Sequence, residues 1–100
     1  MVDLAGVDIL TVLHALSDPV RLEIVRQLSM KCPDSDMPCG QITLPVGKST
    51  ATHHFKMLLS AGVIAERGEG TRKYLHLRKD ELDKRFPGLI DSVLNAPAAS

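Results

Sequence analysis

The stretch Ser49-Thr-Ala-Thr-His-His-Phe-Lys-Met-Leu-Leu-Ser-Ala-Gly-Val-Ile64 decides the fold. Its first half is polar, and its second half places Phe55, Leu58 and Leu59 on one side of a helix. Gly62 follows at a position that tolerates the left-handed conformation in which many helices end. The stretch therefore predicts an amphipathic helix with a polar beginning and an apolar anchor.

The segments before this stretch predict three further helices. The first is expected from about Val7 to Leu16 because its apolar residues recur at helical spacing. The second begins after the N-cap Asp18 and reaches about Met30. Residues 31–38 are rich in turn formers and predict a loop. A short third helix is expected from Cys39 to about Leu44, and Gly47 or Ser49 then caps the fourth.

The pattern changes after residue 62 from helical to extended. Residues 63–65 and 74–77 are β-rich and flank a turn at residues 67–71, which predicts a hairpin. Residues 80–86 are expected to be helical, with a restart after Pro87. The order predicts a mainly α chain with a small β-hairpin, a winged helix-turn-helix of about five helices and a two-stranded wing. We expect one domain over residues 1–95 and a flexible tail over 96–100.

Charge is distributed unevenly along a chain of 100 residues that has no formal net charge. Residues 46–79 carry seven Lys and Arg against two Glu, whereas both flanking segments are net negative. A concentrated positive segment is the electrostatic pattern of a surface that faces phosphate. The chain has no apolar run of about 20 residues, the length that spans a membrane. We therefore expect a cytoplasmic protein whose partner is double-stranded DNA and which binds no membrane.

The candidate DNA contacts divide between the fourth helix and the wing. Small polar and basic residues at a helix N-terminus can reach base edges in a major groove, and long cations beside a turn can reach phosphates. These criteria select Lys48, Ser49, Thr50, Thr52, His53 and Lys56 on the helix and Arg67, Arg72 and Lys73 on the wing. His53 and His54 point about 100° apart on a helix, which disfavours a metal or catalytic pair. We expect one of the two to face DNA and the other to pack beside it.

Four segments in order resemble the arsenic-repressor (ArsR-type) family of winged helix regulators. They are Ala15-Leu-Ser-Asp-Pro-Val-Arg-Leu22, Ser49-Thr-Ala-Thr-His-His-Phe-Lys56, Leu58-Leu-Ser-Ala-Gly-Val-Ile64 and Thr71-Arg-Lys-Tyr-Leu-His-Leu77. The resemblance spans about residues 10–77. It implies a homodimeric repressor whose recognition helix reads the major groove, whose wing approaches the backbone or minor groove and whose terminal helices form the dimer. It also implies release from DNA on sensing a metal or another signal. The family pattern places a histidine at the position of His54, which implies that His53 contacts a base or phosphate and that His54 is partly buried.

Cys32 and Cys39 are candidates for sensing such a signal, because the loop between them can bring their sulfurs together. The family's familiar thiolate site has two cysteines one residue apart, and its other familiar site uses Asp and His on the last helix. This chain has neither pattern. Three interpretations stay open: unreactive thiols, a reversible disulfide switch, or a metal site completed by an acidic residue or another subunit. No cofactor is predicted beyond the metal ion of this third interpretation.

Two other functions are alternatives to DNA-binding regulation. An enzyme is disfavoured because no nucleophile, base and orienting acid are grouped, and no phosphate-binding loop is present. The alternative is a winged helix used as a protein-interaction module without sequence-specific DNA binding, which the near-neutral charge favours. The prediction is a DNA-binding repressor that acts as a homodimer and has no enzymatic activity. A domain of this size buries only roughly 60 to 65% of the surface that its unfolded chain exposes, which also favours a partner subunit.

Overall fold

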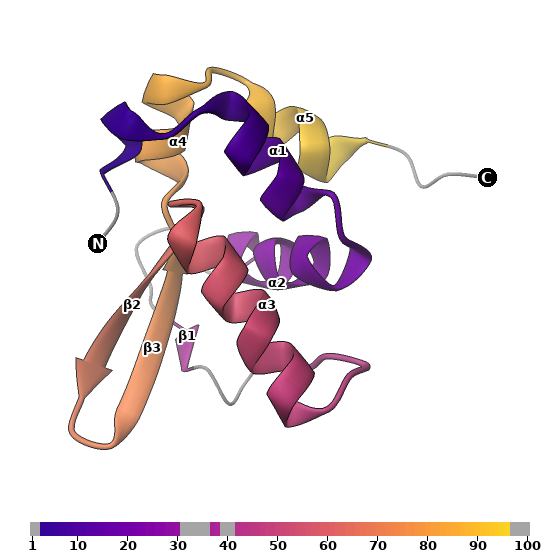
Figure 1. Cartoon of the computed structure of the whole chain (residues 1–100), viewed down its shortest axis with the longest axis vertical. Helices are drawn as coiled ribbons and strands as arrows, with labels where there is room; N and C mark the ends of the chain where they lie inside the picture. The colour runs from indigo at the N-terminus through magenta and orange to yellow at the C-terminus, as the bar shows by residue number, and fades with distance from the viewer. Residues whose placement is uncertain (1–2, 31–36, 39–41, 97–100) are drawn as a thin grey trace.

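The computed structural model describes residues 3–30, 37–38 and 42–96. Its elements follow in this order: η1 (Leu4–Gly6), α1 (Ile9–Leu16), α2 (Pro19–Ser29), β1 (Met37–Pro38), α3 (Lys48–Ser60), β2 (Ile64–Glu69), β3 (Arg72–Leu77), α4 (Lys79–Arg85) and α5 (Leu89–Asn95). Five α-helices and an antiparallel hairpin confirm the predicted mainly α, winged helix fold (Figure 1). Apart from Ala96, the expected flexible tail lies outside the described residues.

Side-chain caps set the beginnings of the first two helices. Asp8 Oδ1 accepts the backbone N–H of Leu10 at 2.7 Å at the start of α1. Asp18 Oδ1 accepts the backbone N–H groups of Val20 at 2.8 Å and Arg21 at 3.1 Å. These bonds satisfy donors that have no partner inside a helix. The predicted N-cap at Asp18 is therefore confirmed.

Replacing Asp18 by Ala is expected to lower the free energy of unfolding by about 1 kcal/mol, because the cap of α2 is lost. The backbone N–H of Arg21 is the main reason that the pKa of Asp18 lies below its ordinary value. The cap is therefore fully ionised at neutral pH, and its contribution disappears only as acid protonates the folded carboxylate. Urea unfolding at neutral pH measures the loss. Asp18→Asn keeps a capping oxygen and is the control, so an equal loss in both variants would contradict this role.

The sheet has the strand order β1-β3-β2, with both pairs antiparallel. Strands β2 and β3 pair from Ile64 with Leu77 to Glu69 with Arg72, so the loop between them has only two residues. Gly70 is the first of the two and has φ of 63°, as the tight II′ hairpin turn requires. The hairpin prediction is confirmed, but the predicted turn was too long. The loop predicted for residues 31–38 was wrong at β1, where Met37 and Pro38 pair with β3.

The third helix predicted from Cys39 to Leu44 was wrong in the part that the structure describes, since residues 42–44 are not helical. The reason is a tertiary contact with Gln27 of α2. Its side-chain amide donates to Thr43 O at 2.7 Å and accepts from Thr43 N at 3.1 Å. Both backbone groups of Thr43 are thus bonded outside a helix. Residues 39–41 lie outside the described part of the chain.

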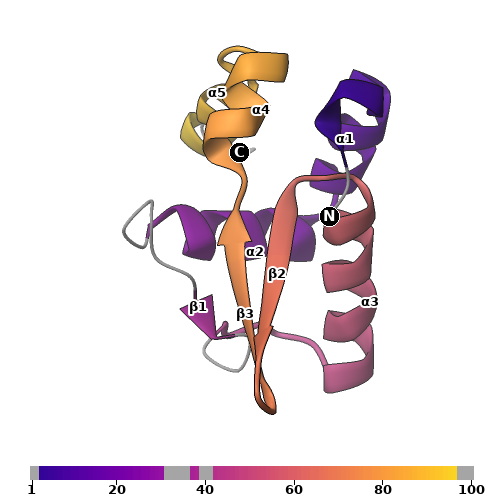
Figure 2. The same ribbon diagram turned by 90° about the vertical axis from the view of Figure 1, so that its left-hand side faces the viewer.

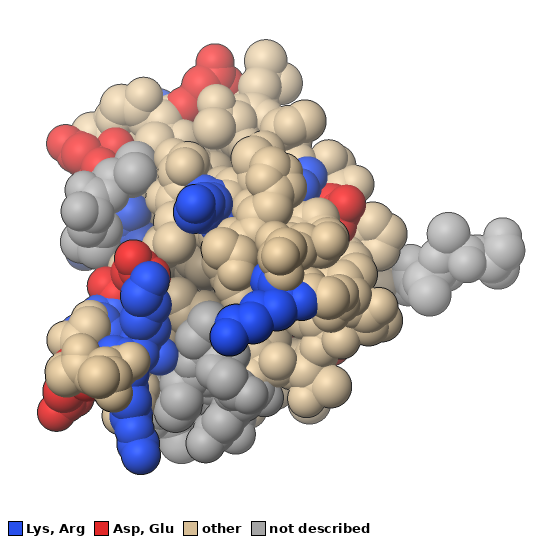
Figure 3. Space-filling model, turned by 60° about the horizontal axis from the view of Figure 1, so that its bottom comes forward, with Lys and Arg blue, Asp and Glu red and all other residues tan. Residues whose placement is uncertain are grey.

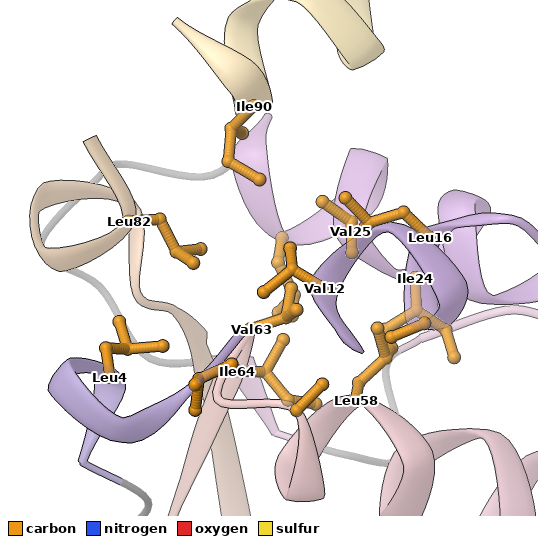
Figure 4. Packing of buried hydrophobic residues seen from close by; sticks show 14 of the residues in the cluster. Leu4, Val12, Leu16, Ile24, Val25, Leu58, Val63, Ile64, Leu82 and Ile90 are labelled. Atoms are coloured by element: carbon orange, nitrogen blue, oxygen red, sulfur yellow. The ribbon is translucent and has the colours of Figure 1, made fainter. Parts of the chain in front are cut away.

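One hydrophobic core joins all the helices to the base of the hairpin (Figure 4). Ile24 of α2 and Leu58 of α3 are completely buried, and Val12 of α1 and Val63 between α3 and β2 pack in the same cluster. Ile90 of α5 closes the cluster on the far side and is also completely buried. The apolar half of α3 is therefore fixed by the core, as its sequence predicted.

The molecule has two distinct ends (Figures 1 and 2). The N-terminal half of α3 and the turn of the β2–β3 hairpin extend toward one end, and α1, α4 and α5 occupy the other. Figure 2 shows α3 and the hairpin lying beside each other, with α2 across them. Over the described ranges, no helix has the length and apolar character that crossing a membrane requires.

Candidate nucleic-acid interface

The first turn of α3 presents free backbone donors to solvent. Gly47 is the N-cap, and no side chain hydrogen-bonds to the start of this helix. Its first N–H groups and the positive end of the helix dipole are therefore available to an anion. No acidic residue occupies this first turn. The beginning of α3 is electrostatically suited to lie beside a phosphate.

Helix α3 has two faces with opposite properties. Ser49, Thr52, His53 and Lys56 recur at intervals of three and four residues, and all four are exposed. Lys48 and Thr50 in the first turn are exposed as well. The opposite stripe is buried or half-buried and consists of Ala51, His54, Phe55 and Leu58. All six predicted contact residues of this helix thus lie on its solvent side.

The exposed side of α3 carries short polar groups and His53, with Lys48 before them and Lys56 after them along the helix. Thr52 Oγ1 donates to Lys48 O at 2.9 Å, so its lone pairs remain for an incoming donor. The ring of His53 is exposed, and its centroid lies 6.0 Å from that of His54. Such residues lie close to the helix surface and let it approach the floor of a groove.

The wing holds its three predicted cations in two different ways. Arg67 donates to Glu69 at 2.7 Å, and its guanidinium carbon lies 4.7 Å from the ring centre of Tyr74. Arg72 and Lys73 are exposed, and neither forms an ion pair within the part of the chain that the structure describes. The wing therefore presents two unneutralised cations, while a cross-strand contact orients the third.

Positive charge gathers at the end where α3 begins and the hairpin turns. Figure 3 looks onto this end, and the blue of Lys and Arg covers more of it than the red of Asp and Glu. Lys48 and Lys56 also form no ion pair within the described ranges. The uneven charge of the sequence is thus a local feature of the surface.

A buried polar cluster supports α3 from behind, and the sequence analysis missed its central residue. Arg21 of α2 is only 9% exposed, and its Nη1 lies 3.3 Å from His54 Nδ1. His54 is 8% exposed, which agrees with its expected burial. A signal was available, because Arg21 is in helical register with the buried Ile24, Val25 and Leu28.

Gln27 is a second supporting residue that the sequence analysis missed. Its paired bonds to Thr43 fix the chain just before the turn that leads into α3. Glu23 Oε2 accepts from the same amide nitrogen at 3.0 Å, which orients the side chain. No sequence signal identifies this role, because a glutamine on a helix surface ordinarily points to solvent.

The structure leaves the cysteine interpretations open. Cys32 and Cys39 both lie outside the described residues. Among the residues that are described, no three His, Cys, Asp or Glu side chains are grouped in a way that could hold a metal ion.

Comparisons with known proteins agree with this geometry. No protein-family model matches the chain. The uncharacterized HTH-type transcriptional regulator YceK of Bacillus subtilis (strain 168) is 34% identical over 84 residues, which are 82% of this chain and 82% of that protein. An ArsR-like transcriptional regulator from Rhodococcus sp. RHA1 has a solved structure that matches with a TM-score of 0.61 and 26% identity, covering 75% of this chain and 69% of that one. The chain therefore belongs to the ArsR-type winged helix-turn-helix family of DNA-binding transcriptional regulators.

Proposed function

We propose that this chain is a cytoplasmic, sequence-specific repressor that binds operator DNA as a homodimer and has no enzymatic activity. The observation that carries the proposal is the common orientation of two features. The exposed stripe of α3 begins at the same end of the molecule as the turn of the hairpin (Figures 1 and 2). One duplex lying across this end would meet both.

In this proposal α3 enters the major groove and supplies sequence readout. Ser49, Thr52 and His53 offer donors and acceptors that match base edges. Lys48 and Lys56 lie before and after them along the helix and are placed for the flanking phosphates. The buried stripe on the opposite side holds the helix to the core, so the readout residues are presented on a rigid element.

The wing supplies affinity more than sequence choice. Arg72 and Lys73 are exposed long cations beside a tight turn, which is where a phosphate backbone or a narrow minor groove can be reached. Arg67 already has an acceptor in Glu69, and its guanidinium is stacked on Tyr74. We propose that Arg67 orients the wing and contacts DNA only by exchanging Glu69 for a phosphate.

The dimer is proposed to form through the terminal helices. Ile9, Leu10 and Leu13 of α1 are 43%, 69% and 39% exposed, and they form an apolar stripe outside the buried side of the helix. Val93 and Leu94 on α5 are only half-buried. Both helices lie at the end of the molecule away from the hairpin turn (Figure 1). A two-fold contact there would leave both α3 helices free to read half-sites about 34 Å apart.

Selection of bound genomic fragments, repeated with and without oxidant or divalent metal, tests the proposal. Recovered fragments should share a motif with two-fold symmetry. A reporter gene placed downstream of such a fragment should be repressed when the protein is present. Gel-shift titration at two salt concentrations is the companion experiment, because binding through phosphates weakens steeply with salt. A protein-interaction module would give no sequence-selective, salt-dependent shift.

The disulfide switch is tested by comparing the DNA affinity of wild type and Cys32→Ser with and without oxidant. The switch predicts that oxidant changes the affinity of wild type, and the same response in Cys32→Ser would exclude it.

Arg72→Ala is expected to weaken binding to every sequence by a similar factor. Each phosphate contact contributes about 0.9 to the slope of log affinity against log salt, so losing one per subunit should reduce a dimer's slope by about 1.8. Fluorescence anisotropy over a salt series measures this change. Thr71→Ala, next to it in the turn, is the matched control. A loss confined to one base position would show that Arg72 reads sequence instead.

A further inference from the structure

Three helices meet at the guanidinium of Arg21. Its Nε donates to Ala15 O at 2.7 Å and its Nη2 to His14 O at 3.3 Å, which satisfies carbonyls at the end of α1. Its Nη1 faces His54 Nδ1 on α3 at 3.3 Å. Arg21 itself belongs to α2 and is buried. The side chain therefore connects the recognition helix to the two helices packed behind it.

The contact between Arg21 and His54 specifies where the imidazole proton lies. A guanidinium carries donors only, so the ring nitrogen that faces it must accept. His54 then has no proton on Nδ1, and its single proton is on Nε2. In this form the ring is neutral, and it offers a buried cation the acceptor that such a charge requires.

A second proton on His54 would remove this contact. The acceptor would become a donor, and two positive groups would face each other in a buried site. A second charged group near the ring is the carboxylate of Asp18, whose Oδ1 lies 3.9 Å from Nδ1. The pKa of Asp18 is below its ordinary value, so this oxygen is anionic when a histidine gains its proton. His53, the titratable neighbour on α3, is exposed and tilted by 59° from the ring of His54.

We propose that Arg21 and His54 form a proton-sensitive lock that positions the recognition helix. With His54 neutral, Arg21 holds the middle of α3 against the end of α1. With His54 protonated, the ring exchanges its contact with Arg21 for one with Asp18, so that α3 loses its link to the end of α1 and shifts from its DNA-reading position. The inference rests on the proposed role of α3 in reading DNA, and it adds a residue pair that controls that role without touching DNA.

The lock predicts a pH dependence opposite to that of simple charge. Acid makes histidines positive, and an exposed positive histidine strengthens attraction to phosphate. Release of α3 would instead weaken binding as acid protonates His54. The sign of the effect therefore separates the two mechanisms.

The first test is the proton position on His54 in the free, unmutated protein. Long-range proton–nitrogen NMR correlations distinguish a ring protonated on Nε2 from one protonated on Nδ1. At about pH 8 the lock requires Nε2–H and an unprotonated Nδ1. An Nδ1–H tautomer would overturn the inference. This measurement needs no DNA, so its result stands even if the proposed DNA binding fails.

The second test measures affinity for a labelled duplex carrying a fragment recovered by the genomic selection, at constant ionic strength. Wild type is compared with His54→Gln, since a glutamine oxygen accepts from Arg21 but does not titrate. His53 is present in both proteins, so any change in its charge affects both alike. Between about pH 8 and the lowest pH at which both proteins remain folded, wild type should lose roughly five- to tenfold in affinity relative to His54→Gln, the factor that one hydrogen bond carries.

The outcomes separate the inference from the function on which it rests. Equal pH dependence in wild type and His54→Gln would overturn the lock, even if both bind DNA. No duplex bound by wild type at any pH would refute the proposed function, and the NMR result alone would then decide the state of His54. Thermal unfolding by circular dichroism shows that both proteins are folded at each pH. If His54→Gln does not fold, Arg21→Gln replaces it in the comparison and should also abolish the acid loss, because no cation then faces the ring.

Discussion

Leu58→Ala is expected to lower the free energy of unfolding by about 2–5 kcal/mol, the range found when a large buried side chain is truncated. Leu58 is completely buried and packs in the cluster that contains Ile24 and Val12. The truncation leaves a cavity between α3 and the helices behind it, which these elements can close only if α3 moves. Urea unfolding at a fixed protomer concentration measures the effect, because the proposed dimer would make the apparent stability depend on concentration.

Ser60→Ala is the matched control on the same helix. Ser60 is exposed, and its substitution should change the free energy of unfolding by no more than about 0.5 kcal/mol. A loss below about 1 kcal/mol for Leu58→Ala would contradict the core described here, since it would mean that the site repacks freely.

Leu10→Glu is expected to separate the proposed dimer and to weaken operator binding at least about a hundredfold, because the second half-site contact no longer benefits from being intramolecular. Leu10 is the most exposed residue of the apolar stripe on α1, with 69% of its surface accessible in the single chain. The fold of the subunit should therefore survive the substitution. In a two-fold interface each Glu would be buried near its counterpart, where the two carboxylates repel each other. Light scattering and anisotropy titration on the same samples measure both effects.

Thr11→Glu introduces the same charge at the next, exposed position of α1 and is the control. It should remain dimeric and keep the affinity of wild type within about threefold, since surface substitutions outside an interface change little. A Leu10→Glu protein that remains dimeric would place the interface elsewhere. A monomer that binds as tightly as wild type would contradict the two-half-site arrangement.

Local chemistry along the chain was enough to predict most of the helices and the hairpin. Asp18 followed by Pro19 marks the start of α2, and Gly47 and Gly62 bracket α3. Each of these signals acts within a few residues, through a missing N–H partner or an allowed positive φ. Sequence therefore predicted the element that carries the candidate interface and the division of that element into polar and apolar faces.

Long-range pairing accounts for the errors in the fold. Residues 42–44 are not helical because Gln27, 16 residues away from Thr43, bonds both of its backbone groups. Met37 and Pro38 form a strand because β3 lies beside them. Neither partner is visible in the local pattern, and local propensity gives way when a distant group satisfies the backbone.

The exposed stripe of α3 and the two cations at the hairpin turn follow from spacing and charge, which are properties of the chain itself. Only the tertiary structure shows that the stripe and the turn lie at one end of the molecule (Figure 2). It alone also shows that Arg21 and His54, 33 positions apart, meet in a buried contact. The physical reason is that a helix pattern specifies which side is buried but not what it is buried against. Close packing and the need of a buried cation for an acceptor decide the rest.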